Sequence, residues 1–296
     1  MATTEHDEWR TRKRAIYQNL RDRPLDYANE ADHALYQAVH DPEHDPVQRL
    51  FNLIDTGRDQ SVQLVAGFRG VGKTTELSRL ETLLWKAGYL VARIDLKDHL
   101  DLHSPIDVRD FLLILTGAMS EALLDERLLD RETALKLNFW HRAKDFLAGL
   151  ADTEVMLRDS SGTLNWKVLI TENHEFRDQV RRTLGAKLPL LEREVQAFVG
   201  AVVEALRVRH GPGRPFVLIV DSLEHIRGTP DKVRAVHESV RELFLTHGKR
   251  LVFPDVHMVF SVPAFMALKA DNVTAEFVNG AVQAWAAFHV WHRDDK

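Results

Sequence analysis

The spacing of apolar residues changes twice between positions 62 and 95. Residues 62–66 form a short apolar run typical of a strand, and residues 73–87 carry three leucines at helical spacing. Residues 89–95 form a second strand-like run. A strand, a helix and a strand within this length predict a βαβ unit, whose two strands lie parallel in one sheet.

The same alternation continues through the second half of the chain. Helical periodicity covers residues 187–210 and 231–247, and the apolar runs at 216–221 and 256–262 are typical of strands buried on both faces. A last strand is expected within 282–291. Together these elements predict an α/β fold, a three-layer sandwich built on a mainly parallel, doubly wound sheet.

A turn-rich break, DPEHDP at residues 41–46, divides the chain into two parts. We expect residues 1–45 to form a helical N-terminal extension. Residues 46–296 are expected to form the α/β domain, with a helical insertion around 105–210. Residues 151–172 have no apolar period, which indicates a loop within that insertion.

The N-terminal residues 8–23 combine a helical apolar spacing with several basic side chains (Arg10, Arg12, Lys13, Arg14, Arg21 and Arg23). This pattern is typical of an amphipathic helix whose charges are solvated. Contact with nucleic acid or with an acidic partner is the alternative, and we do not favour it.

Composition narrows the function classes only slightly. The chain has 296 residues and a net charge of −5, so no overall basic field attracts nucleic acid or membranes. No segment approaches the ~20 apolar residues that a membrane span needs. Cysteine is absent, which excludes disulfides and thiolate metal sites. We therefore expect a cytoplasmic protein without membrane contact.

The most specific motif lies between the first strand and the helix that follows it. Gly67, Gly72, Lys73 and Thr74 satisfy the pattern G-x-x-x-x-G-K-[ST]. Glycines allow backbone N–H groups to turn inward around phosphate oxygens, and the start of the helix favours the same anion. We predict that the whole loop binds nucleotide phosphate: Gly67, Phe68, Arg69, Gly70, Val71, Gly72, Lys73, Thr74 and Thr75.

Two residues of the loop have side-chain roles in this prediction. Lys73 is expected to reach the β- and γ-phosphate oxygens, and the Thr74 hydroxyl is expected to be a ligand of Mg²⁺. For Phe68 and Arg69 we expect only backbone contacts.

A phosphate loop of this kind also needs a carboxylate at the carboxyl end of a neighbouring strand. The run FVLIVD ends in Asp221, our candidate for the Mg²⁺ acid, and Glu224 could position the attacking water. Asp95, which ends the strand at 89–95, is the alternative acid. Without these roles, Asp221 would be a helix N-cap and Glu224 a solvated loop carboxylate.

With these elements in place, the chain resembles P-loop NTPases of the additional-strand type, the broad group that includes AAA+ and STAND ATPases. The resemblance covers roughly residues 41–292. It implies ATP and Mg²⁺ as cofactors, and a central strand between the strands that carry the phosphate loop and Asp221. That central strand would be VHMVFSVP, and Ser261 would be the sensor residue that contacts the γ-phosphate.

The chain departs from that group in two respects. Its last strand is followed only by FHVWHRDDK, so we expect no C-terminal lid, and its two acids are separated by two residues. We therefore expect a homo-oligomer or a protein partner that supplies a lid or an arginine finger. Arg241 and Arg250 are candidate fingers, although a solvated surface charge is the commoner role of such residues.

Our leading hypothesis is an ATP-binding, Mg²⁺-dependent ATPase that couples nucleotide state to conformation or assembly. The rival is a nucleotide-gated switch or scaffold with little turnover, and a small-molecule kinase ranks third. The fifteen histidines lack the spacing of a transition-metal site, and no G-x-S-x-G elbow indicates a hydrolase.

Overall fold

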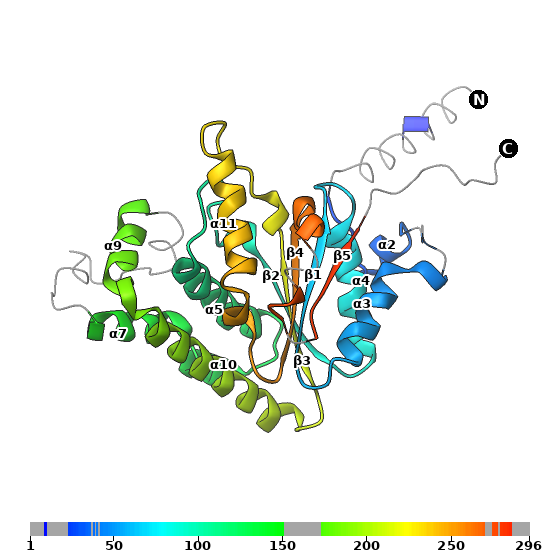
Figure 1. Cartoon of the computed structure of the whole chain (residues 1–296). Helices are drawn as coiled ribbons and strands as arrows, with labels where there is room; N and C mark the ends of the chain where they lie inside the picture. The colour runs from blue at the N-terminus through cyan, green and yellow to red at the C-terminus, as the bar shows by residue number, and fades with distance from the viewer. Residues whose placement is uncertain are drawn as a thin grey trace.

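The structure, a computed structural model, describes residues 9–10, 23–36, 38, 40, 42–150, 173–269, 274–277 and 279–285. Its centre is a five-stranded sheet in the order β2-β3-β4-β1-β5, in which all neighbouring strands run parallel (Figure 1). The strands are β1 (Ser61–Gly67), β2 (Leu90–Asp95), β3 (Phe216–Asp221), β4 (Val256–Pro263) and β5 (Ala281–Ala284).

The central strands are continuous apolar runs because both of their faces are covered. Every residue of β1, β3 and β4 is buried, as expected for a parallel sheet between two helical layers. The predicted strands are confirmed, and β5 begins one residue before its predicted range. Strand β4 lies between β1 and β3, which is the strand order that the resemblance implies.

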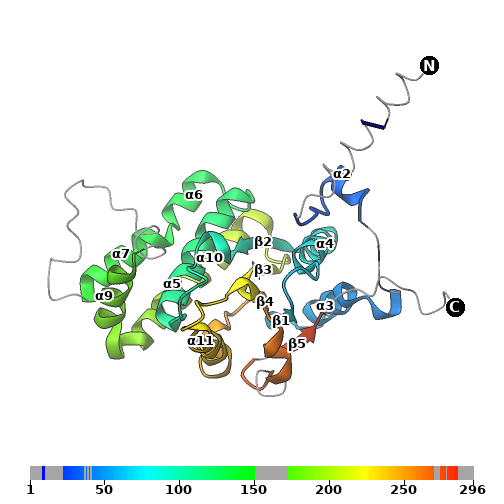
Figure 2. The same cartoon turned by 90° about the horizontal axis from the view of Figure 1, so that it is seen from above.

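Helices cover both faces of the sheet (Figure 2). On one face, α3 (Pro46–Asp55) and α4 (Lys73–Lys86) pack against one set of strand side chains, such as Val65 and Ile219. On the other face, α5 (Val108–Asp125), α10 (Leu188–His210) and α11 (Val233–Leu245) pack against the alternate set, such as Leu64 and Leu218. The α/β fold with helices on both faces is therefore confirmed.

The remaining helices flank this sandwich. Between β2 and β3, α6 (Arg131–Lys136), α7 (Phe139–Leu150) and α9 (His174–Leu184) accompany α5 and α10, in the region where helices are predicted. Two predicted segments lie outside the described residues. One is the loop at 151–172, and the other is the helix at 8–23 apart from Trp9, Arg10 and Arg23. Among the described helices, none has the length and apolar character that crossing a membrane requires.

The most apolar of the described helices, α5, lies between the sheet and the outer helices, and one glycine permits its close contact with α7. A Cβ atom built on Gly117 would lie 2.1 Å from the Trp140 ring. That ring is itself fixed, since Trp140 Nε1 donates to Glu121 at 3.0 Å. Gly117 therefore provides the space that the indole fills.

We expect Gly117→Ala to destabilise the fold by about 2 kcal/mol, because overpacking of a close contact forces the ring or the helix to move. Gly200→Ala is the matched control. Gly200 is exposed in α10 with nothing near its Cβ position, so alanine should stabilise the helix by up to about 1 kcal/mol. Urea unfolding measures the change in the free energy of unfolding for both variants. Equal changes for Gly117→Ala and Gly200→Ala would contradict the proposed contact.

Candidate functional site

The phosphate loop joins β1 to α4, and its glycines are required by the backbone. Gly70 and Gly72 have φ angles of +82° and +87°, in the left-handed region that other residues rarely adopt. A Cβ atom on Gly67 would lie 2.8 Å from the carbonyl oxygen of Trp285. The glycines identified in the sequence motif therefore lie where only glycine fits without strain.

Lys73, the first residue of α4, is buried and is held by the loop itself. Its Nζ donates to the carbonyl oxygens of Gly67 at 3.1 Å and Phe68 at 2.7 Å, and it lies 3.1 Å from Glu224 Oε1. The Phe68 side chain, by contrast, is 72% exposed. The lysine charge is thus neutralised by a carboxylate in this conformation, and an anion in the loop would compete with Glu224 for it.

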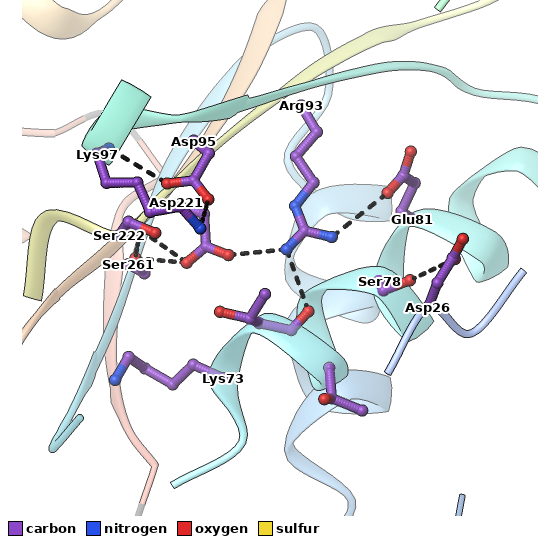
Figure 3. A network of polar contacts seen from close by, with 12 residues as sticks. Asp26, Lys73, Ser78, Glu81, Arg93, Asp95, Lys97, Asp221, Ser222 and Ser261 are labelled. Carbon is purple, nitrogen blue, oxygen red and sulfur yellow. Dashed lines mark hydrogen bonds and ion pairs between the residues drawn. The ribbon is translucent and has the colours of Figure 1, made fainter. Parts of the chain in front are cut away.

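Asp221 ends β3, and its side chain is fully buried. Its Oδ1 accepts from Ser222 N at 2.8 Å and from Ser261 Oγ at 2.9 Å. Its Oδ2 lies 2.8 Å from Arg93 Nη2 (Figure 3). Asp221 caps no helix, since the short helix after β3 (Leu223–His225) has Ser222 at its N-cap, so that interpretation of Asp221 is wrong.

Arg93, on β2, is the site residue that the sequence analysis missed. Its Nη2 also donates to the Thr74 carbonyl oxygen at 3.2 Å, and its Nη1 lies 3.9 Å from Glu81 Oε2 (Figure 3). The guanidinium therefore links the acid of β3 to the first turn of α4. An arginine inside a strand whose neighbours are mostly buried was the available signal, because such a charge needs a partner.

Glu224 and Ser261 complete this cluster. The Glu224 side chain is 3% exposed, so its interpretation as a solvated loop carboxylate is wrong. Ser261 Oγ lies 2.6 Å from Glu224 Oε2 and 2.9 Å from Asp221 Oδ1, and it accepts from Ser222 N. Because a hydroxyl has one hydrogen, Ser261 can donate to only one carboxylate at a time.

The alternative acid, Asp95, lies beside Asp221 in the strand register. It pairs with Lys97 at 2.5 Å and accepts from Lys97 N. Although burial alone would raise its pKa, hydrogen bonds from Lys97 and Ser222 lower the pKa of Asp95. Asp95 is thus ionised and paired with Lys97. Because Asp95 and Asp221 end neighbouring strands, the position of Asp95 does not exclude it as the alternative acid.

The N-terminal residues 23–36 lie along α4 next to the loop. Leu25 N donates to the Thr75 hydroxyl at 3.0 Å, and Tyr27 N donates to Ser78 Oγ at 2.9 Å. The Thr75 side chain therefore contacts the N-terminal segment, and its predicted contact with phosphate through the backbone stays a prediction.

The two candidate fingers lie on other surfaces. Arg241 pairs with Glu238 at 2.8 Å within α11, and Arg250 pairs with Glu192 of α10. Neither ion pair includes a residue of the cluster around Asp221. A role in contact with another subunit stays a prediction.

The described residues contain no group of three His, Cys, Asp or Glu side chains that could hold a metal ion by themselves. The cluster around Asp221 does offer oxygen ligands for a divalent cation. The Asp221 carboxylate and the Thr74 hydroxyl are the ligand types that Mg²⁺ takes together with phosphate oxygens. In the described conformation, the Arg93 guanidinium pairs with this carboxylate.

Comparisons with known proteins give no relative: no family model matches the chain, and no curated protein is similar in sequence.

We expect Arg93→Met to destabilise the fold by about 3 kcal/mol, because it leaves the buried Asp221 carboxylate without its cation. Asp221→Asn in the same background should recover most of that loss, as measured by a double-mutant cycle in urea. Arg241→Met removes a half-exposed ion pair and should change stability by no more than about 0.5 kcal/mol. If the effects of Arg93→Met and Asp221→Asn on the free energy of unfolding simply add, Arg93 acts through packing alone.

Glu81 should make stability depend on pH. Burial raises its pKa to about 7, more than the nearby Arg93 lowers it. Because the folded pKa lies above the unfolded value, the stabilising contribution of the protonated form is lost as pH rises through about 7. Between pH 5.5 and 8.5, wild type should lose about 2 kcal/mol relative to Glu81→Gln.

Denaturant unfolding of both proteins at the two pH values measures this difference. Glu204 is exposed, so Glu204→Gln should have the same free energy of unfolding as wild type at both pH values. A Glu81→Gln variant that also follows wild type would mean that the carboxylate is ionised throughout.

Proposed function

We propose that the chain binds ATP with Mg²⁺ and hydrolyses it to ADP and phosphate. One observation carries the proposal: three segments bring Lys73, Asp221 with Glu224, and Ser261 together at the carboxyl end of the sheet, with Lys73 Nζ 3.1 Å from Glu224 Oε1. Ligands of open parallel sheets bind at this end. The resemblance to P-loop NTPases agrees with the proposal.

Phosphate binding would be the work of the loop and its lysine. The backbone N–H groups after Gly70 and the start of α4 attract an anion. Lys73 would leave Glu224 and the two loop carbonyls and take phosphate oxygens as new partners. The exchange replaces one buried ion pair by another, so the lysine charge stays compensated.

Thr74 and Asp221 would hold Mg²⁺, which when bound would neutralise charge on the β- and γ-phosphate oxygens. Arg93 must then give up its contact with Asp221 Oδ2, and the nearby Glu81 carboxylate offers the guanidinium another partner. Metal binding is therefore coupled to movement of one arginine.

Hydrolysis would use the carboxylate that Lys73 releases. Glu224 accepts a proton from water as the water oxygen bonds to the γ-phosphorus and the bond from that phosphorus to the bridging oxygen breaks, which leaves ADP and phosphate. Ser261 can donate to either carboxylate, so its hydroxyl can follow the change in charge.

The rival function, a nucleotide-gated switch, is supported by the same ion pairs. Both the Lys73–Glu224 and the Arg93–Asp221 contacts have to break when nucleotide and metal bind. A switch needs only that rearrangement, and turnover can be slow.

We expect Lys73→Ala to bind ATP at least about 100-fold more weakly and Glu224→Gln to lower phosphate release at least about 100-fold. Glu224→Gln should also bind ATP several-fold more tightly, because it removes the carboxylate that competes for Lys73. Phosphate release with Mg²⁺ and equilibrium ATP binding measure these effects. A dilution series of wild type tests whether turnover needs assembly.

The exposed residues Lys86 and Glu204 allow the same replacements, Lys86→Ala and Glu204→Gln, as controls, and both variants should match wild type. ATP binding without phosphate release at any protein concentration would favour the switch. Unchanged ATP binding by Lys73→Ala would reject the proposed site.

A further inference from the structure

A cavity of about 440 Å³ borders Arg93. Helix α4 contributes Thr74 and Glu81 to its wall, the end of α5 contributes Glu126, and the N-terminal segment contributes residues between 24 and 28. The Arg93 side chain is 21% exposed. Because the space beside it is not filled by other side chains, the guanidinium can change partners without displacing a packed residue.

Arg93 lies between two carboxylates at unequal distances. Its Nη2 is 2.8 Å from Asp221 Oδ2, whereas its Nη1 is 3.9 Å from Glu81 Oε2, too far for a hydrogen bond (Figure 3). Among the described residues, no hydrogen bond to the Glu81 carboxylate accompanies this ion pair. The guanidinium is therefore bound to Asp221 and has a second carboxylate within reach.

Glu81 is the buried one of four carboxylates in the cavity wall, with 8% of its surface exposed. The other three come from different elements: Asp95 of β2, Glu126 at the end of α5 and Asp26 of the N-terminal segment. Burial raises the pKa of Glu81 to about 7; Arg93 lowers this pKa, and Glu126 and Asp26 raise it. A closer approach of Arg93 would therefore favour the ionised form of Glu81 near neutral pH.

The proposed function needs Asp221 for a different cation. While the guanidinium pairs with Asp221, a divalent cation at that carboxylate would meet a like charge. Arg93 cannot leave without a new partner, because a largely buried charge without compensation is costly. An ionised Glu81 would compensate the guanidinium, whereas a protonated Glu81 would not.

We propose that Glu81 is a positioning residue for the metal: its carboxylate takes over the Arg93 guanidinium and so frees Asp221 for Mg²⁺. The inference rests on the proposed function and adds its regulation by pH. Since Glu81 has to be ionised in the metal-bound state, binding of nucleotide with Mg²⁺ releases a proton wherever Glu81 is protonated beforehand. The affinity therefore falls as the pH falls through the raised pKa of Glu81, about 7.

The test is equilibrium binding of ATP to the full chain, with excess Mg²⁺ and with EDTA, at about pH 8 and about pH 6. The measured quantity is the gain in ATP affinity that Mg²⁺ gives. At about pH 8 the wild-type gain should exceed that of Glu81→Gln at least about tenfold. At about pH 6, where only about a tenth of Glu81 is ionised, this excess should be between about fivefold and tenfold smaller.

Two features of this design separate positioning from a structural role. ATP affinity in EDTA should be the same for wild type and Glu81→Gln, whereas damage to the fold would lower it. The ionisation of ATP itself acts on both proteins, so the comparison between them removes it. Glu126→Gln removes a charge that raises the pKa of Glu81, so this variant should keep the pH dependence and shift its midpoint to lower pH.

Glu204→Gln, at an exposed position of α10, is the matched control and should follow wild type at both pH values. Equal gains for wild type and Glu81→Gln, or an excess that does not change with pH, would overturn the inference and leave the proposed function in place. Failure of wild type to bind ATP in either condition would overturn the proposed function together with the inference.

Discussion

The architecture of the site depends on the burial of one carboxylate. Asp221 is fully buried at the end of a central strand, and an ionised carboxylate in such a place needs a cation and hydrogen bonds. These come from three different elements: Arg93 on β2, Ser261 on β4 and the backbone of Ser222. Meeting the needs of one charge thus fixes the ends of three strands relative to one another.

The charges around Asp221 form a set that is neutral as a whole. Lys73 and Arg93 oppose Glu224 and Asp221, and Ser261 lies between the two acids. A polyphosphate with its cation adds several charges to a nearly water-free space, where unpaired charges are costly. Under the proposed function, the existing pairs would therefore exchange partners together. An ATPase and a switch would share this exchange and differ only in what Glu224 does afterwards.

The sequence predicts those parts of the structure whose causes are local. Apolar runs identify the strands, and three glycines with Lys73 identify the loop, because both patterns act within a few residues. The Arg93 contact with Asp221 joins residues 128 positions apart, and no local pattern states which acid a strand arginine meets.

The first turn of α4 connects these separate features. Three adjacent positions of this turn reach three neighbours, one through a backbone carbonyl and two through side chains that point about 100° apart. The Thr74 carbonyl accepts from Arg93, the Thr75 hydroxyl accepts from Leu25 N of the N-terminal segment, and the Glu76 carboxylate accepts from the Tyr36 hydroxyl. A ligand that moves this turn necessarily acts on all three contacts. Under the proposed function, nucleotide binding would therefore act on residues 23–36 without any hydrolysis, and conformational coupling would need fewer of the contacts in this site than turnover does.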